Sequence, residues 1–381
     1  MFIYKKLLII LISLFTISLF CNDVYSYEYN TPAKQAYMID VETGTVLYSK
    51  NATSHMPTSS MSKAMTAYVV FDALKNKQIS LNDTFLISKK AWKKGGSKMF
   101  IEVGKRVKIE DLLHGLLTQS GNDASIALAE GVAITEEAFA RMLNSTAKKL
   151  GMNNSNFKNA SGWPDPDHYS TAEDLAILAK AIINNHPEYY QKFFSVKEFT
   201  FNEITQKNRN PLLFRDMNAD GLKTGHTEIA GYGLIGSAIR DDRRVIMVIN
   251  GLNSEKDRAE EGARLLEWGL AGFKNNKIIP KEDIIAELDT VFGKKSTIQV
   301  KTKEDIIISI PNTEINNLKT SISYNSPIIA PIKKNDKIAE LIIKINGMDD
   351  IIMPLIAAED IQEQGIFLKT ISKIKLAIFG Q

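Results

Sequence analysis

The stretch "GYGLIGSAIRDDRRVIMVINGL", residues 231–252, decides the architecture of this chain. Two strongly apolar runs, Gly231–Ile239 and Arg244–Leu252, flank the charged segment Arg240-Asp241-Asp242-Arg243. Long apolar runs joined by a short charged turn predict a long antiparallel hairpin that is buried on at least one face. The rest of the chain must supply the elements that cover this face.

Strand patterns occur on both sides of a helical middle. Ala36–Asp40 and Thr45–Tyr48 read as strands around Glu42-Thr43-Gly44, which is a hairpin signal. Apolar residues at helical spacing predict helices at Met61–Leu74, Ile109–Leu117, Ala124–Ala133, Glu136–Leu150 and Ala172–Ile183. Ser254 starts a further helix, with Asp257 placed to complete a capping box. We therefore expect an α+β fold in which terminal strands share one sheet.

The residue pattern of the sequence changes after Phe273, from helical periods to short β-rich runs. We expect Asn275–Lys277 and Pro280 to form a linker. Short runs rich in isoleucine and valine follow, at Thr297–Val300, Ile306–Ile310, Ile328–Ile332, Ile338–Ile345 and Ile351–Leu355. Short strands with turn residues between them predict a small all-β domain. It contains no titratable cluster that suggests chemistry, which favours a spacer or docking role.

The end of the chain, Gly365–Phe379, predicts a basic amphipathic helix. Phe367, Ile371, Ile374 and Ile378 fall on one stripe, and lysines fall on the other side. Such a helix suits the interface of a membrane. The alternative is a terminal helix that docks on its own domain, and we favour the membrane.

The N-terminus predicts export. Lys5 and Lys6 precede an apolar run from Leu7 to Phe20, and Val24-Tyr25-Ser26 offers a cleavage site. This order is typical of a secretory signal peptide, and the alternative is an uncleaved membrane anchor. The expected segments are a signal peptide at 1–26, the helix–sheet domain at 27–274, a β-rich domain at 275–360 and an anchor helix at 361–381.

Composition excludes several classes of function. The net charge of +3 and the absence of a basic stripe give no warrant for a nucleic-acid partner. Cys21 is the only cysteine and lies in the predicted leader, so thiol catalysis and disulfides are excluded. The histidines show no metal-ligand spacing, and we expect neither a metal nor a cofactor.

The segment "PTSSMSKAMT" carries the first chemical motif, Ser60-x-x-Lys63. A serine hydroxyl is a weak nucleophile until a neighbouring base removes its proton. Residues three apart share a helix face, so Lys63 can reach Ser60. Lysine acts as a base only where burial or a second cation lowers its pKa. The motif is common by chance, so it needs support from elsewhere.

Two further motifs supply that support. "LLTQSGNDAS" contains Ser120 and Asn122, which we expect on a loop between two helices. "DGLKTGHTEIAGYGL" contains Lys223-Thr224-Gly225 just before the apolar strand, where Gly225 would let a ligand backbone lie close. The ordered set Ser-x-x-Lys, Ser-x-Asn and Lys-Thr-Gly is the signature of penicillin-binding proteins and class A β-lactamases.

From about Thr31 onward the chain resembles the low-molecular-mass penicillin-binding proteins of the D-alanyl-D-alanine carboxypeptidase (peptidase S11) type. Besides the motifs, "GSKMF", "GYGLIGSA", "SPIIAPIKKND" and the terminal helix are similar to that family. The resemblance implies a serine β-lactamase-like α+β domain, then a small all-β domain and a C-terminal amphipathic helix. It also implies removal of the terminal D-alanine from peptidoglycan pentapeptides through an acyl-enzyme, with β-lactams as covalent inhibitors.

The resemblance also implies residue roles. Ser60 matches the nucleophile, Lys63 the acylation base and Ser120 a proton relay, with Asn122 and Lys223 completing the catalytic set. Thr224 and Gly225 match substrate-binding positions, and the backbone N–H groups of Ser60 and His226 match the oxyanion hole. Arg209 and Arg258 resemble the residues that bind the substrate carboxylate, for which arginine is the natural partner. The implied location is the bacterial periplasm, at the outer face of the inner membrane.

Three alternatives stay open. A β-lactamase would need a glutamate to activate the deacylating water, but "ARMLN" places Ala140 where the Glu-x-x-Leu-Asn signature has its acid. A DD-endopeptidase would use the same machinery on cross-links. A non-catalytic wall-binding relative would have no evident need for an activated lysine.

Overall fold

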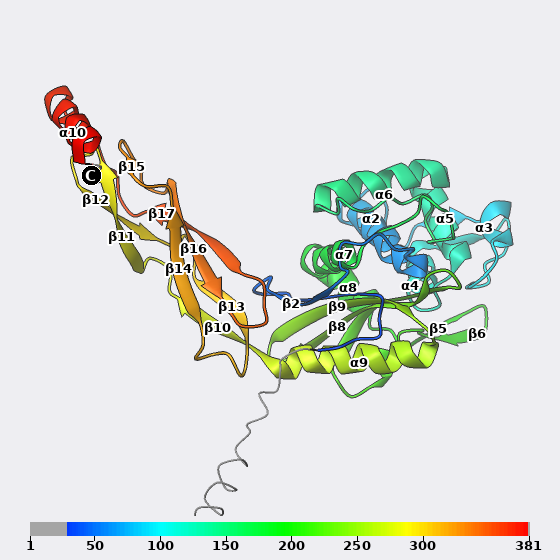
Figure 1. The fold of residues 1–381 in the computed structure, drawn as a ribbon. Helices are drawn as coiled ribbons and strands as arrows, with labels where there is room; N and C mark the ends of the chain where they lie inside the picture. The colour runs from blue at the N-terminus through cyan, green and yellow to red at the C-terminus, as the bar shows by residue number, and fades with distance from the viewer. Residues whose placement is uncertain (1–28, 380–381) are drawn as a thin grey trace, which may run out of the picture. The chain divides into compact units, whose positions relative to one another are not determined.

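The computed structural model describes residues 29–379 and has a five-stranded antiparallel sheet in the order β2-β1-β9-β8-β7 (Figure 1). Its strands are β1 (Gln35–Asp40), β2 (Val46–Lys50), β7 (Ala219–Thr227), β8 (Gly231–Arg240) and β9 (Arg243–Leu252). The predicted hairpin is confirmed as β8 and β9, which pair with Ile235 opposite Val248. The N-terminal strands join the same sheet because β1 pairs with β9, as expected.

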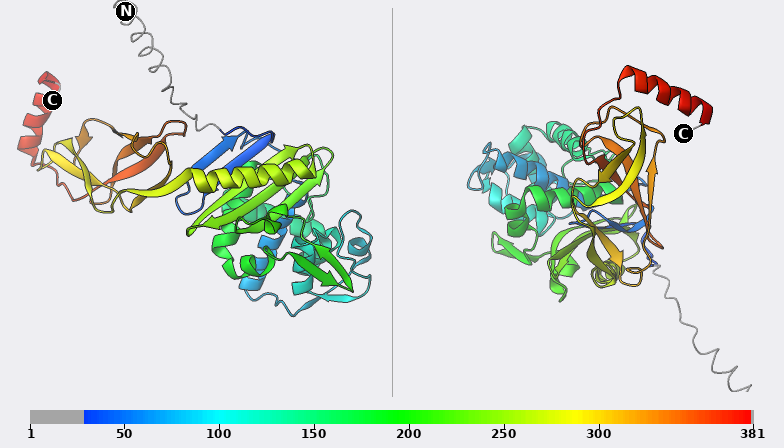
Figure 2. Two further views of the ribbon diagram at one scale, coloured as in Figure 1. Left: turned by 90° about the horizontal axis from the view of Figure 1, so that it is seen from below. Right: turned by 90° about the vertical axis from the view of Figure 1, so that its left-hand side faces the viewer.

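Helices cover both faces of this sheet. α9 (Glu255–Gly272) lies across one face, and α7 (Ala172–Asn185) packs on β1 and β9 from the other (Figures 1 and 2). A strand covered on both faces has no polar side, which is why β9 reads as a continuous apolar run. Gly269 allows close packing of α9, since a Cβ there would lie 2.3 Å from Met38 Sδ.

The helical half of this region is built around α2 (Lys63–Lys75), which is buried at every position from Lys63 to Phe71. The other helices are α3 (Lys89–Lys93), α4 (Ile109–Leu117), α5 (Asn122–Ala133), α6 (Glu136–Leu150) and α8 (Pro187–Phe193). The predicted helices are confirmed, with shifted ends at α2, α5 and α7. α2 starts later than expected because the 3-10 turn η1 (Ser59–Ser62) precedes it.

Local capping explains where several helices begin. The hydroxyls of Thr135, Thr171 and Ser254 accept hydrogen bonds from the backbone N–H three residues ahead, at 3.0–3.1 Å. Each such cap is worth about 1 kcal/mol. The short elements β3 (Thr84–Leu86), β4 (Arg106–Lys108), β5 (Glu198–Phe201), β6 (Ile204–Lys207) and η2 (Pro211–Phe214) were not predicted, because they are too short to show a clear hydrophobic period.

The segment expected as a linker is instead strand β10 (Phe273–Ile279), so that prediction is wrong. β10 pairs with β13 (Ile306–Pro311), and this backbone pairing outweighs the polar composition of the segment. A six-stranded sheet follows in the order β14-β16-β17-β12-β11-β15. Its strands are β11 (Ile284–Val291), β12 (Thr297–Lys301), β14 (Lys319–Tyr324), β15 (Ile328–Ile329), β16 (Lys337–Lys344) and β17 (Ile351–Ala357). The expected all-β region is confirmed, with an isoleucine-rich core.

The C-terminal helix α10 spans Ile366–Phe379, as expected from its periodicity. Phe367 and Ile374 of its apolar stripe are 78% and 53% exposed, and the side chain of Ile378 lies outside the described residues. Among residues 29–379, no helix is both long enough and apolar enough to cross a membrane. The predicted signal peptide also lies outside the described residues, and the four domain limits stay a prediction.

Candidate active site

Ser60 lies in η1, the 3-10 turn that leads into α2. This turn is strained, since Ser59 adopts a left-handed φ of +49°. It also stands very close to β7. A Cβ on Gly225 would lie 2.7 Å from the carbonyl oxygen of Thr58 and 3.3 Å from Ser59 Cβ. Gly225 is therefore needed where the strand meets the nucleophile turn, which is a different reason from the ligand approach that we expected.

Lys63 is the first residue of α2 and is fully buried. Its Nζ lies 2.8 Å from Ser60 Oγ, 2.8 Å from Asn122 Oδ1 and 2.7 Å from the carbonyl oxygen of Ser161. The last two atoms only accept hydrogen bonds. A neutral amine that donates to both therefore directs its lone pair toward the Ser60 hydroxyl.

The electrostatic surroundings favour this neutral form. The pKa of Lys63 is lowered from 10.5 to about 7, chiefly by burial and also by the charges of Arg209 and Lys94, against an opposing effect of Asp123. Among residues 29–379, the three hydrogen-bond partners of the amine are a hydroxyl, an amide and a carbonyl oxygen, and none is a carboxylate. At neutral pH a large fraction of Lys63 is therefore unprotonated, which is the condition for a general base.

Asn122 holds Lys63 in place. Its Oδ1 accepts from Lys63, and its Nδ2 donates to the carbonyl oxygen of Gly95 at 2.8 Å, so both ends of the amide are engaged. Asn122 begins α5 and does not lie on a loop as expected, whereas Ser120 does. The neighbouring Asp123 was not predicted. Its carboxylate accepts the backbone N–H groups of Met99 and Phe100 at 3.0 Å each, which anchors the segment next to Gly95.

Ser120 and Lys223 form a second serine–lysine pair. Lys223 Nζ donates to Ser120 Oγ at 2.9 Å and to the carbonyl oxygen of Thr224 at 3.2 Å. Ser120 has a φ of +63° and is 2% exposed. Burial, followed by the charges of Lys63, Arg209 and Arg258, holds the pKa of Lys223 well below its usual range. Lys223 lies within the edge strand β7, which directly precedes β8, the apolar strand that the motif was expected to precede.

The two predicted arginines lie at the same end of the site. Arg209 is exposed, and its charge lowers the pKa of Lys63, Lys223 and Arg258. Arg258 is 4% exposed, pairs with Glu255 at 2.8 Å, and lies over the Tyr232 ring at 5.6 Å. This end of the site therefore presents positive charge suited to a carboxylate.

The predicted oxyanion position lies on the same edge strand. β7 pairs only with β8, so part of its backbone N–H groups face away from the sheet. The side chain of His226 stacks on Tyr232 at 3.9 Å between ring centroids. The backbone N–H of His226, not its ring, is therefore the group that we expect to bind the oxyanion. The roles of the Ser60 and His226 N–H groups stay a prediction.

The loop formed by residues 157–170, between α6 and α7, supplies contacts that sequence reasoning missed. Its Ser161 carbonyl binds Lys63, and its Ala160 carbonyl accepts from Thr66 Oγ1 at 2.7 Å. Gly162, at a φ of +74°, presses against the Ser59 carbonyl, where a Cβ would lie at 1.7 Å. The sequence did carry one indication of this role, namely the long connection between the helices predicted at 136–150 and 172–183. Connections longer than about 12–15 residues are usually functional.

His168 links this loop to the nucleophile turn. Its Nδ1 accepts the backbone N–H of Lys158 at 3.2 Å, which assigns the ring proton to Nε2. Nε2 then donates to Ser62 Oγ at 2.8 Å, and Ser62 Oγ lies 2.6 Å from Thr58 Oγ1. Burial lowers the pKa of His168 to about 4, so the ring is neutral near pH 7.

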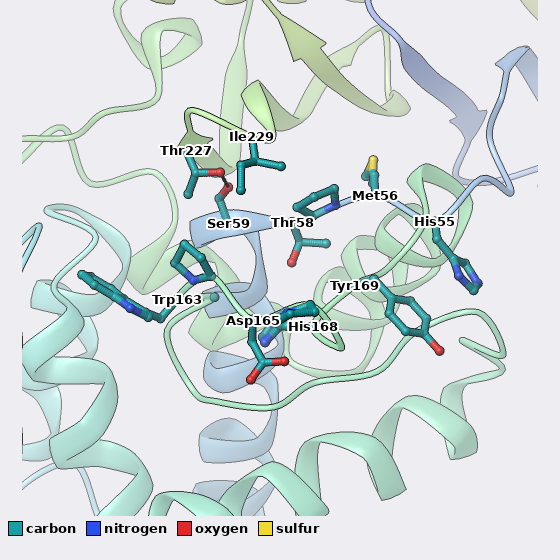
Figure 3. Close-up of a pocket in the computed structure, with 14 residues that line it drawn as sticks. His55, Met56, Thr58, Ser59, Trp163, Asp165, His168, Tyr169, Thr227 and Ile229 are labelled. Atoms are coloured by element: carbon teal, nitrogen blue, oxygen red, sulfur yellow. Dashed lines mark hydrogen bonds between the residues drawn. The ribbon is translucent and has the colours of Figure 1, made fainter.

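A cavity of about 650 Å³ adjoins the nucleophile turn, between this loop and the turn that joins β7 to β8 (Figure 3). It is lined by His55, Met56, Pro57, Thr58, Ser59, Gly162, Trp163, Pro164, Asp165, Pro166, His168, Tyr169, Thr227 and Ile229. Among residues 29–379, no group of His, Cys, Asp and Glu side chains is arranged to hold a metal ion.

A serine hydroxyl beside a buried lysine with a lowered pKa, backed by a second serine–lysine pair, defines the class of active-site serine enzymes that use lysine as base. The D-alanyl-D-alanine carboxypeptidase model of peptidase S11 matches residues 24–254, and the model of the C-terminal domain of penicillin-binding protein 5 matches residues 273–363. The chain belongs to the D-alanyl-D-alanine carboxypeptidase family.

Individual relatives agree with this assignment. The chain is 38% identical over 343 residues to D-alanyl-D-alanine carboxypeptidase DacC of Escherichia coli, covering 88% of this chain and 86% of that relative. Penicillin binding protein 5 from Haemophilus influenzae superposes with a TM-score of 0.76 at 34% identity, covering 88% of this chain and 99% of that one. Penicillin-binding protein D2 from Listeria monocytogenes, solved in an ampicillin-bound form, superposes with a TM-score of 0.58 at 32% identity, covering 64% and 98%.

Proposed function

We propose that the protein is a serine-type carboxypeptidase that removes the terminal D-alanine from peptidoglycan stem peptides ending in D-Ala-D-Ala. The observation that carries this is the position of Lys63 Nζ, 2.8 Å from Ser60 Oγ and held by two acceptors. Family membership supplies the substrate class.

The first step is acylation of Ser60. Lys63 removes the Oγ proton, and Oγ attacks the carbonyl carbon of the penultimate D-alanine. The negative charge on the carbonyl oxygen is stabilised by the backbone N–H groups of Ser60 and His226. The C–N bond then breaks, and the leaving amine takes a proton that Ser120 relays while Lys223 holds its hydroxyl. The products are an ester on Ser60 and free D-alanine.

The second step is hydrolysis of this ester. Water attacks the ester carbonyl and gives a proton to Lys63, which returns it to Ser60 Oγ as the ester bond breaks, and the shortened peptide leaves as a carboxylic acid. The terminal carboxylate of the substrate fits the positive end of the site, where Thr224, Arg209 and Arg258 lie near Lys223. This recognition of a free C-terminus distinguishes a carboxypeptidase from an endopeptidase.

β-Lactams fit the same site as acylating inhibitors, as in the ampicillin-bound relative. The structure offers little support for a β-lactamase. Ala140 lies on α6 and is 7% exposed, and Asn144 of the same segment binds the Phe157 backbone at 2.8 Å. The position that carries the water-activating acid in class A enzymes is therefore a buried methyl group. We expect stoichiometric acylation by nitrocefin, and fast multiple turnover would contradict the proposal.

The direct test is release of D-alanine from diacetyl-Lys-D-Ala-D-Ala by the purified protein. Ser60→Ala should abolish both this release and covalent labelling by fluorescent penicillin. Ser59→Ala is the matched control, because Ser59 precedes the nucleophile but does not contact Lys63. Labelling of Ser60→Ala would show that the nucleophile lies elsewhere, and labelling without D-alanine release would favour a wall-binding or cross-link-cleaving relative.

We further propose export to the periplasm by the N-terminal signal and attachment to the outer face of the inner membrane through α10. Exposed Phe367 and Ile374 on this helix support an interfacial role. Deletion of residues 365–381 should release the processed protein from the membrane fraction with its soluble activity intact. A truncated protein that still sediments with membranes would refute the attachment.

A further inference from the structure

Positive charge is concentrated in one short part of the chain, from β3 to β4, residues 84–108, which we call the basic segment. It contains eight lysines and arginines and one acid, Glu102, although the net charge of the whole chain is only +3. The rest of the chain therefore carries more acids than bases. The small net charge of the sequence did not reveal this local concentration.

The lysines of α3, the helix within the basic segment, are exposed. This helix buries only Ala91, and Lys89 and Lys93, four residues apart, share an exposed face. Lys90 is paired with two acids of α6 at 2.8 and 3.4 Å. Among residues 29–379, no acid lies within ion-pair distance of Lys89 or Lys93. These two amines are therefore available to an anion from outside the chain.

Exposed aromatic rings accompany these charges. Trp92 is 42% exposed, and its carbonyl oxygen accepts a hydrogen bond from Lys98 Nζ at 2.8 Å. Phe100 is 49% exposed. Aromatic residues are enriched at interaction surfaces, because a ring gives a large contact area at a small cost in conformational entropy. A tryptophan ring also offers an apolar face on which a sugar ring can pack.

The basic segment borders the catalytic groups. The carbonyl oxygen of Ser97 accepts the backbone N–H of Asn122 at 2.7 Å, and the carbonyl oxygen of Gly95 accepts from Asn122 Nδ2 at 2.8 Å. Asn122 in turn accepts a hydrogen bond from Lys63. A polymer held on the basic segment therefore lies beside the site at which its peptide reacts.

Peptidoglycan is a polymer with the matching charge, and choosing it as the partner rests on the proposed function. Each free stem peptide ends in a carboxylate, both before the terminal D-alanine is removed and afterwards. A strand of the polymer thus presents repeated carboxylates and sugar rings. Weak contacts with such a polymer add up, because binding of one stem raises the local concentration of its neighbours. Nucleic acids and anionic lipids are also negative, but neither brings a stem peptide to Ser60.

We propose that the basic segment is a second binding surface for polymeric peptidoglycan, separate from the catalytic groups. Lys89 and Lys93 bind carboxylates of neighbouring stems, and Trp92 packs on a sugar ring. The surface keeps the enzyme on the polymer between reactions, so it favours the polymer over short soluble peptides.

The test compares two substrates: a dilute suspension of purified sacculi whose stems end in D-Ala-D-Ala, and soluble diacetyl-Lys-D-Ala-D-Ala. For Lys89→Gln/Lys93→Gln, the initial rate of D-alanine release from sacculi should fall about fivefold, the loss of two exposed ion pairs. The rate with the soluble peptide should keep its wild-type value. Lys148→Gln/Lys149→Gln is the matched control, because it removes the same charge from exposed positions in the last turn of α6. It should leave both rates unchanged.

Binding is measured apart from turnover, in Ser60→Ala protein. This protein should sediment with sacculi at about 50 mM NaCl and much less at about 500 mM, because salt screens exposed charges. Conversion of the sacculus carboxylates to neutral amides should lower its sedimentation to the level of the protein that also carries Lys89→Gln/Lys93→Gln.

The outcomes separate the surface from the activity. An unchanged rate with sacculi for Lys89→Gln/Lys93→Gln would overturn the surface, and so would an equal loss in the matched control, because the effect would then be one of general charge. A loss of binding confined to anionic lipid vesicles or DNA would also overturn it. No D-alanine release from either substrate would overturn the proposed function, whereas sedimentation that depends on Lys89 and Lys93 would still support the surface.

Discussion

Lysines are buried both in the helix–sheet region, residues 31–272, and in the C-terminal β region, residues 273–363. The two regions differ in the groups that surround the buried amine. In the β region Lys301 is 7% exposed and forms an ion pair with Glu282. In the helix–sheet region Lys63 and Lys223 are equally buried, yet they contact only hydroxyl, amide and carbonyl oxygens. A carboxylate partner favours the charged amine, whereas burial among neutral acceptors favours the neutral amine.

This difference explains why Lys301 has a structural role, whereas Lys63 and Lys223 belong to the active site. Keeping Lys63 at a pKa of about 7, not 10.5, costs the folded protein roughly 5 kcal/mol at neutral pH. The core of the β region, by contrast, is built mainly from isoleucine side chains. Stability is given up in the active site, where the neutral amine of Lys63 is needed as a base.

The largest expected effect comes from Lys63→Met. Loss of the base should slow acylation by fluorescent penicillin by about a thousandfold or more. Stability should change little. Leaving Asn122 Oδ1 and the Ser161 carbonyl without a donor costs about 1–3 kcal/mol each, and removing a destabilised amine gains a similar amount. Stopped-flow acylation and thermal unfolding measure the two effects. A variant that acylates at the wild-type rate would show that Lys63 is not the base.

The pH dependence should follow the same amine. The neutral fraction of Lys63 rises with pH through its pKa of about 7, so the acylation rate should rise about tenfold per pH unit below that value and level off above it. The folded pKa lies below the unfolded one, so the unfolded chain binds more protons between about pH 7 and 10.5 and stability rises with pH across that window. A second-order acylation rate that is flat from pH 5 to 7 would contradict the assignment of Lys63 as base.

A smaller effect is expected at His168, which positions the nucleophile turn without touching the reacting atoms. His168→Leu removes the donor to Ser62 and the acceptor of the Lys158 N–H, and should lower the acylation rate about tenfold by loosening the turn. His168→Gln can make both hydrogen bonds and should restore most of the rate. Equal acylation rates for the two variants, each corrected for its folded fraction, would show that the hydrogen-bonded chain has no positioning role.

The smallest effect is expected from Lys301→Met, the counterpart of Lys63→Met in the β region. Glu282 is largely exposed and can be solvated after its partner is lost, so the free energy of unfolding should fall by no more than about 1 kcal/mol. Acylation by penicillin should be unchanged. A loss of acylation in this variant, measured beside Lys63→Met, would mean that the two buried lysines do not differ as described.

Much of the fold followed from local pattern, and the failures have a common cause. The β8–β9 hairpin and the long helices were predictable, because their hydrophobic periods are long enough to read. Strand β10 was misjudged as a linker, since its polar residues are held by pairing with β13, a partner about thirty residues away. Asn122 was placed on a loop because a Ser-Gly-Asn triplet signals a turn, although it also begins α5.

By itself, the sequence determined the α+β order and the three motifs that contain Ser60, Ser120 and Lys223, because these depend on residues close together in the chain. Only the tertiary structure decided what surrounds them. Burial lowers the pKa of Lys63, the 157–170 loop supplies its second acceptor, and the space that Gly225 leaves empty faces the nucleophile turn. The aromatic-walled cavity beside Asp165 is likewise absent from any local pattern. Desolvation and close packing arise from segments far apart in sequence, so they appear only when the chain is folded.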